Sequence, residues 1–209
     1  MPADLKKKFD IILSREQISA KYVALKALTP KPLSVWEVLI PILFILSFMK
    51  SKQDREVFAQ NLLFTKKLAL EAALDMIEKN KSRESVMDQI KSKTDQLIST
   101  LPDNLYSNAI RQEQVKEIDL LIDHYCKLIQ AEGNDYDALV LSAYGNREQY
   151  KAFHARLKDA EKKVAQAARQ TLGVNTDSAM AARIEEAMNK QRMAEVEKIF
   201  GPQGKQQNA

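Results

Sequence analysis

Hydrophobic residues recur at helical spacing along almost the whole chain, but one stretch departs from this pattern. Residues 35–49 (VWEVLIPILFILSFM) are apolar on every side, with Glu37 as their only charged residue. From Val38 onward only Pro41 and Ser47 interrupt the large apolar side chains. A helix that is apolar all round must be covered by protein or by lipid. The pattern therefore predicts that this segment inserts into a membrane or into a protein core.

The start of this segment carries the signals of a helix N-terminus. Residues 34–37 (SVWE) fit a capping box, in which the side chains of the first and last residues each accept a hydrogen bond from the backbone N–H of the other. Two prolines closely precede this box and disfavour helix before it. Pro41 then removes one hydrogen-bond donor inside the helix. We expect a helix that begins at Ser34 and is kinked near Pro41. It can continue well past Lys50, because no Gly or Pro follows before Pro102.

The length of the segment distinguishes three interpretations. Fifteen helical residues extend over ~22 Å, whereas the hydrocarbon core of a bilayer is ~30 Å thick. This length favours a shallow or re-entrant insertion over the two alternatives, a helix covered by protein and a full span. In the favoured interpretation an aromatic residue lies at the interface, apolar residues insert and basic residues contact lipid headgroups. The predicted contact residues are Trp36, Leu39, Ile40, Leu43, Phe44, Leu46, Phe48, Lys50, Lys52 and Arg55.

Basic residues are concentrated around this segment. Residues 1–55 hold ten Lys and Arg against five Asp and Glu, whereas the rest of the chain is almost balanced and the whole chain has a net charge of +4. Basic residues beside an inserted segment contribute about 1 kcal/mol each at an anionic membrane surface. They flank the segment on both sides, as expected if both of its ends stay in the cytoplasm. The charge pattern therefore predicts an anionic membrane surface, or a protein partner, as the contact of this region.

The remainder of the chain has the composition and periodicity of an all-α protein. Ala, Leu, Lys, Glu and Gln are abundant, and only five Gly and six Pro occur. No stretch shows the alternation of apolar and polar residues that is typical of a β-strand. We predict a multi-helix bundle of about six helices, one of which is the hydrophobic, Pro-kinked segment. The expected division is an amphipathic N-terminal helix with a Pro linker over 1–32, the inserting segment with its basic flanks over 33–55, a helical bundle over 56–200, and a disordered tail over 201–209.

Turn-forming residues set the expected boundaries within the bundle. Ser82 is expected to cap the helix that follows it, and Gly133 and Gly145 are expected to close the segments that precede them. The predicted helices after the apolar stretch cover about 50–80, 82–101, 105–131, 147–172 and 177–200, with a short apolar segment over 135–144.

The clearest heptad pattern lies in the helix predicted over 147–172. Its core positions repeat at alternating spacings of three and four, and small residues in its second half predict close packing against a partner helix. Packing within the chain is the default expectation, and a homo-oligomer is the alternative. The residues of this stripe are Tyr150, Phe153, Leu157, Ala160, Val164, Ala167 and Thr171.

Residues with catalytic or metal-binding chemistry are scarce. The chain has one cysteine and two histidines, and His124 and Cys126 are close in sequence, but residues two apart on a helix point in different directions. We therefore expect a structural or surface role for His124 and a space-filling role for Cys126. Around His154, Tyr144 and Tyr150 indicate a core aromatic cluster rather than a catalytic site.

Several classes of function lack the motifs that they require. Neither histidine follows a Glu by three residues, as carboxylate-bridged di-metal bundles need. No phosphate-binding loop, dinucleotide signature or nucleophile elbow occurs. The modest net charge of +4 and the lack of a basic–aromatic platform argue against nucleic acid as a partner. A single cysteine suits a reducing compartment, and the first 30 residues lack the apolar core of a secretory signal, which indicates a cytoplasmic protein.

These observations favour a non-enzymatic cytoplasmic protein without a cofactor. In the first hypothesis, residues 35–49 attach it peripherally or monotopically to the cytoplasmic face of a membrane, and the bundle acts as a scaffold or adaptor. In the alternative, the chain is a soluble protein–protein interaction module that buries residues 35–49 in its own core or in a homo-oligomer. An enzyme whose site the sequence does not disclose is the third hypothesis.

Overall fold

Seven helices make up the part of the chain that the computed structural model describes, which covers residues 1–27, 55–98, 107–172 and 179–201. No strand occurs in those ranges, so the all-α prediction is confirmed there. The helices are α1 (Ala3–Ala27), α3 (Arg55–Glu78), α4 (Arg83–Ile98), α5 (Asn108–Gln130), α6 (Tyr136–Tyr144), α7 (Arg147–Leu172) and α8 (Ala179–Phe200).

The hydrophobic segment predicted over 35–49 lies outside the described residues. Its capping box, its kink and its extent stay predictions, and so do nine of the ten contact residues predicted for it. Arg55 is the tenth, and it is the exposed first residue of α3. Of the tail predicted over 201–209, only Gly201 is described. No helix within the described ranges has the length and apolarity needed to cross a bilayer.

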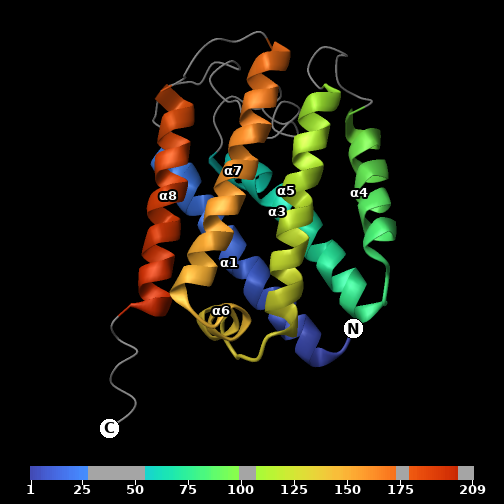
Figure 1. Ribbon diagram of the computed structural model, residues 1–209, viewed down its shortest axis with the longest axis vertical. Helices are drawn as coiled ribbons and strands as arrows, with labels where there is room; N and C mark the ends of the chain where they lie inside the picture. The colour runs from blue at the N-terminus through green and yellow to red at the C-terminus, as the bar shows by residue number, and fades with distance from the viewer. Residues whose placement is uncertain (28–54, 99–106, 173–178, 202–209) are drawn as a thin grey trace.

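The helices are arranged in two layers. α5, α7 and α8 lie side by side in one layer with α4 beside α5 at its edge, and α1 and α3 cross behind them as an antiparallel pair (Figure 1). The short α6 lies across one end of the bundle (Figure 1). At the opposite end lie the C-termini of α1, α4 and α7 and the N-termini of α3, α5 and α8 (Figure 1).

The core consists of two clusters of buried side chains. The larger cluster draws on α1 and on all the helices from α3 to α8, and Tyr125 and Tyr150 are its largest fully buried residues. The smaller cluster joins α1, α3 and α8, and it contains Ala27 and Phe58, which are 0% and 1% exposed. Because these two residues share one cluster, the chain leaves α1 and enters α3 at neighbouring points.

Local capping signals set several helix boundaries. Ser82 caps α4 as predicted, because its hydroxyl accepts a hydrogen bond from the N–H of Ser85 at 3.2 Å. Gly145 ends α6 with a φ of 69°, in the left-handed region that favours glycine. The next residue, Asn146, begins α7 by accepting a hydrogen bond from the N–H of Gln149 at 2.9 Å.

The prediction that Gly133 closes α5 is wrong. The C-cap of α5 is Ala131, whose N–H donates to the carbonyl of Leu128 at 3.3 Å. Gly133 is required for a different reason, since a Cβ at this position would lie 2.8 Å from the backbone nitrogen of Leu139. The glycine therefore allows the connection after α5 to pass directly against α6.

The heptad stripe predicted on α7 faces the interior of the bundle. Tyr150, Leu157 and Val164 are each at most 4% exposed, and α7 packs against α5. The hydroxyls of Thr171 and Ser107 lie 2.6 Å apart near the end of this contact. The partner of the heptad stripe is therefore a helix of the same chain, as predicted.

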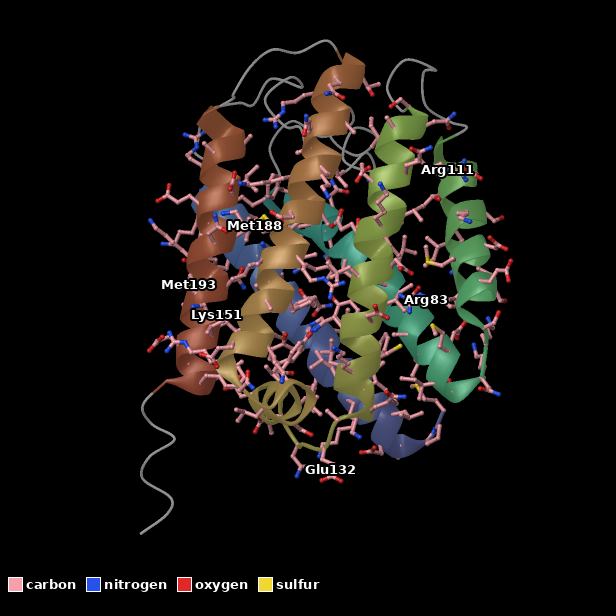
Figure 2. All side chains as sticks on the ribbon, viewed as in Figure 1. Arg83, Arg111, Glu132, Lys151, Met188 and Met193 are labelled. Carbon is pink, nitrogen blue, oxygen red and sulfur yellow. The ribbon has the colours of Figure 1, made fainter. Side chains whose placement is uncertain are left out.

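Arginine contacts connect α4 to α5. Arg83 donates to Asp119 at 2.7 Å and to Asp123 at 2.6 Å, and Arg111 donates to Asp95 at 2.7 Å. Figure 2 shows the two arginines at different heights along the pair of helices. These contacts are half-exposed, so they fix the position of α4 while contributing little to stability.

Candidate functional site: a polar cavity inside the bundle

A cavity of about 430 Å³ lies between the helices of the bundle, lined by residues of α1, α3, α5, α6, α7 and α8. This volume is in the range of small-molecule sites. Apolar residues that line it, including Val23, Ile110, Val164 and Ile184, belong to the helix ends remote from α6. Met188 also lines it and lies on the side of α8 next to α7 (Figure 2). Toward that end of the bundle the lining thus includes a group of apolar side chains, together with Lys162, Arg169 and Glu185.

The polar part of the lining begins with Glu16 on α1. Its buried carboxylate accepts hydrogen bonds from Nζ of Lys66 at 2.6 Å and from the hydroxyl of Tyr125 at 3.0 Å. These contacts join α1, α3 and α5. Because each carboxylate oxygen has a donor, the burial of this charge is compensated.

Glu195 on α8 is held in a similar way. It accepts hydrogen bonds from Nε of Arg15 at 3.0 Å and from Nη2 at 2.6 Å, and it also accepts one from the hydroxyl of Tyr150. The Tyr136 hydroxyl lies 3.4 Å from that of Tyr150. The resulting network connects α8 to α1, α6 and α7, which fixes the positions of the cavity walls.

A third ion pair lies between α8 and α7. Arg192 donates to Glu161 at 2.5 Å, and the two side chains are only 14% and 21% exposed. Burial lowers the pKa of Arg192, but its interaction with Glu161 outweighs this effect and the net pKa lies above the ordinary value. The guanidinium is therefore charged, and its charge is matched by its partner.

Glu117 on α5 differs from these paired groups. Its side chain is 6% exposed, and its Oε2 has no hydrogen-bond partner among the described residues. Burial, together with the negative charge of Glu161, raises the pKa of Glu117 from 4.5 to about 8, against the opposing effects of Lys66 and Arg192. At pH 7 most of the Glu117 carboxyl groups are therefore protonated.

The two histidines lie in the aromatic cluster at the α6 end of the cavity. Nδ1 of His124 and the hydroxyl of Tyr144 are 2.6 Å apart, and the His124 ring stacks on Phe153 with the ring centroids 4.1 Å apart. His154 makes an edge contact with Tyr150, with centroids 4.4 Å apart. The aromatic cluster predicted from the sequence is confirmed, and it forms part of the cavity lining.

Both imidazoles are neutral at pH 7. Burial, assisted by the positive charge of Lys66 among others, lowers the pKa of His124 and of His154 to about 3. Neither ring nitrogen of His154 has a hydrogen-bond partner in the described part of the chain. A neutral imidazole offers one donor and one acceptor. Like Glu117, His154 therefore has unused hydrogen-bonding capacity where it lines the cavity.

A second heptad stripe on α5 explains why Glu117 lies inside the bundle. Residues at alternating spacings of four and three along α5 are all buried, although three of them are polar. An interior position was not predicted from the sequence for Glu117, Glu16, Glu195 or their cationic partners. Polar residues that recur at core positions are the signal that could have identified Glu117. The residues of this stripe are Ile110, Gln114, Glu117, Leu121, His124 and Leu128.

The residues singled out in the sequence have different positions relative to the cavity. His124 and His154 line it, whereas Arg55 does not. Cys126 is half-buried against the core, where burial raises the pKa of its thiol, so the thiol is protonated at neutral pH. Within the described ranges, no three His, Cys, Asp or Glu side chains are grouped so that they could hold a metal ion.

Comparison of the chain with protein-family models, with curated proteins and with solved structures finds no match.

Proposed function

We propose that this protein is a non-enzymatic binding protein that holds a small molecule in the cavity lined by α1, α3, α5, α6, α7 and α8. The observation that carries the proposal is Glu117, a buried carboxyl group with an oxygen that has no hydrogen-bond partner in the described residues, in the wall of a cavity of about 430 Å³. A ligand with a complementary polar group would supply the missing partner.

The energetics of burial support this proposal. Leaving a buried polar group without a hydrogen bond costs ~1–3 kcal/mol, whereas an apolar residue of similar shape would have no such cost. His154 carries the same kind of penalty on a second wall of the cavity. A bundle that had only to be stable would gain from apolar residues at both positions, so the two groups are better explained as a ligand site.

The surrounding ion pairs suit a binding site of fixed shape. The hydrogen bonds of Glu16 and Glu195 connect the helices on every side of the cavity. A site preorganised in this way loses little conformational entropy when a ligand binds. The paired residues are thus the frame of the proposed site, and the groups with free hydrogen-bonding capacity are its contacts.

The test is a thermal-shift screen with small amphiphilic cations, neutral molecules and anions, made with two matched variants. Ala165 lines the cavity on α7, and Ala155 is exposed on the same helix. We expect at least one class of compound to raise the Tm of the wild type and of Ala155→Phe, and to have no effect on Ala165→Phe. If no class shifts the wild-type Tm, or if the shift persists in Ala165→Phe, the cavity is not a ligand site.

A second candidate function is attachment to an anionic membrane through residues 35–49, with the bundle as a scaffold or adaptor. The observation that favours it is the common burial of Ala27 and Phe58 in one cluster, because a segment between two neighbouring points can enter and leave a membrane on the same side. The outer face of α1 adds support, since Ile18 and Leu25 are 56% and 55% exposed and lie two turns apart. This supports shallow or re-entrant insertion more than a full span.

Flotation with anionic and with neutral liposomes tests the second candidate. The wild type should float with anionic liposomes, and the double variant Leu43→Asp with Phe44→Asp should not. Leu141→Asp is the control, because Leu141 is an exposed apolar residue of α6 at the other end of the bundle. A wild-type protein that stays monodisperse and does not float with liposomes would instead favour the soluble interaction module. A defined dimer would indicate a homo-oligomer.

A further inference from the structure

We propose that the cavity is built for a protonated amine with an apolar body, whose ammonium group contacts Glu117 and His154 and whose body lies against the apolar side chains of the cavity lining. This inference rests on the proposed binding function and specifies the class of ligand. It follows from the charges, the hydrogen-bonding groups and the apolar residues of the cavity lining.

The buried cationic side chains of the cavity lining already have carboxylate partners. Arg15 and Lys66 already pair with carboxylates at 2.6 Å, and Arg192 pairs with one at 2.5 Å. At the more exposed part of the lining, Lys158 and Lys162 share one carboxylate at 3.3 Å, in contact with solvent that screens them. An anionic ligand beside Arg15, Lys66 or Arg192 would therefore compete with the carboxylate that each of them already has. The buried group without an ion-pair partner is a carboxyl, and a cation would complement it.

The hydrogen-bonding groups point to the same class. An ammonium group has three donors and no acceptor, a carboxylate has only acceptors, and a neutral imidazole has one acceptor nitrogen. Ionised Glu117 and neutral His154 each offer an acceptor to an ammonium group. The rings of Tyr150 and Phe153, which contact His154, also line the cavity and can stabilise a cation through their faces.

The apolar part of the lining determines the rest of the ligand. Val23, Leu62, Ile110, Val164 and Ile184 line the cavity toward the helix ends remote from α6. An alkyl or aryl group on the amine would be removed from water there. Each methylene that becomes buried should strengthen binding about 4-fold.

Binding of a cation is expected to displace the proton of Glu117. The groups that act on Glu117 are Glu161 of α7, which raises its pKa, and Lys66 of α3 and Arg192 of α8, which lower it. On its own helix Tyr125 lies close enough to interact with it. Because the pKa of Glu117 without ligand is about 8, binding at pH 7 should release close to one proton. The affinity should rise nearly tenfold from pH 6 to pH 7 and then level off above pH 8.

Calorimetric titration of the full chain with hexylamine, hexanol and hexanoate tests the inference. The titrations are made at pH 7 in phosphate and in Tris, whose different ionisation enthalpies reveal the number of protons released. We expect hexylamine to bind at least tenfold more tightly than either of the other two compounds, with release of nearly one proton. Octylamine should bind more tightly than hexylamine, and butylamine more weakly.

Matched variants connect the result to Glu117. Glu117→Gln should weaken hexylamine binding at least tenfold and abolish proton release, and circular dichroism checks its fold. Glu113→Gln is the control, because Glu113 lies on the same helix and pairs with Lys116 at the surface. Hexylamine binding that survives Glu117→Gln, or that releases no proton, overturns the inference. Preferential binding of hexanol or hexanoate overturns it too but leaves the proposed binding function standing, whereas a failure of all three compounds counts against both.

Discussion

The buried carboxyl of Glu117 should make this protein less stable as the pH rises from acidic to neutral values. The folded-state pKa of about 8 lies above the ordinary value of 4.5. Between these two values the unfolded chain loses the proton while the folded chain keeps it. The unfolded state is therefore favoured progressively as the pH increases through this window, and the effect is complete above pH 8.

The magnitude follows from the difference between the two pKa values. Each pH unit between them corresponds to ~1.4 kcal/mol, so the stability difference between Glu117→Gln and the wild type should grow by ~3 kcal/mol from pH 4.5 to pH 7. It should reach up to ~5 kcal/mol above pH 8. Glutamine has nearly the same shape as glutamate but cannot ionise, so the variant removes this penalty without leaving a void.

Urea denaturation followed by circular dichroism, at half-unit steps from pH 4.5 to 8.5, measures this difference. The stability curve of the wild type is subtracted from that of Glu117→Gln, because the histidines also make the stability of the wild type depend on pH below 6.5. The variant Glu113→Gln removes a surface glutamate from the same helix and should change stability by less than ~0.5 kcal/mol at every pH. A difference between Glu117→Gln and the wild type that does not change with pH would show that Glu117 is solvated, and the account of the cavity would be wrong.

Three further substitutions test other parts of the structure. His154 has a pKa of about 3 in the folded chain against 6.5 ordinarily, so stability is lost as the pH falls below 6.5; His154→Leu should reduce that loss by up to ~1.4 kcal/mol per pH unit in the same urea assay. Glu195→Ala leaves Arg15 and Tyr150 without their buried partner and should destabilise the fold by ~3–5 kcal/mol in urea; a loss below 1 kcal/mol would mean that the pair is solvated. Gly133→Ala places a Cβ 2.8 Å from a backbone nitrogen of α6 and should lower stability by ~1–3 kcal/mol, seen as a lower Tm, whereas an unchanged Tm would indicate that this connection moves easily.

The helices could be predicted from the sequence because the residue patterns that specify them are local. The spacing of apolar residues on α7, the cap at Ser82 and the glycine at Gly145 each depend on residues within two turns of one another. Such features are fixed by backbone geometry and by short-range hydrogen bonds. The prediction for Gly133 was wrong because this glycine is required by the close approach of α6. That approach is a contact between two elements and not a property of one helix end.

The cavity could not be predicted from the sequence. A glutamate on a predicted helix is ordinarily assigned to the solvated face, and nothing in the neighbouring sequence of Glu117 shows that residues from α3, α7 and α8 surround it. The same holds for Glu16, whose partners Lys66 and Tyr125 are 50 and 109 residues away along the chain. Pairing over such separations depends on how whole helices pack.

By itself, the sequence determined that the described chain is helical, where several of its helices begin and end, and which face of α7 is buried. The tertiary structure alone decided which partners the interior charged residues have. The physical reason is that helix formation depends on interactions a few residues apart, whereas the burial of a charge depends on donors brought together from several helices. Glu117 became a candidate contact residue only when six helices were seen to line one cavity beside it.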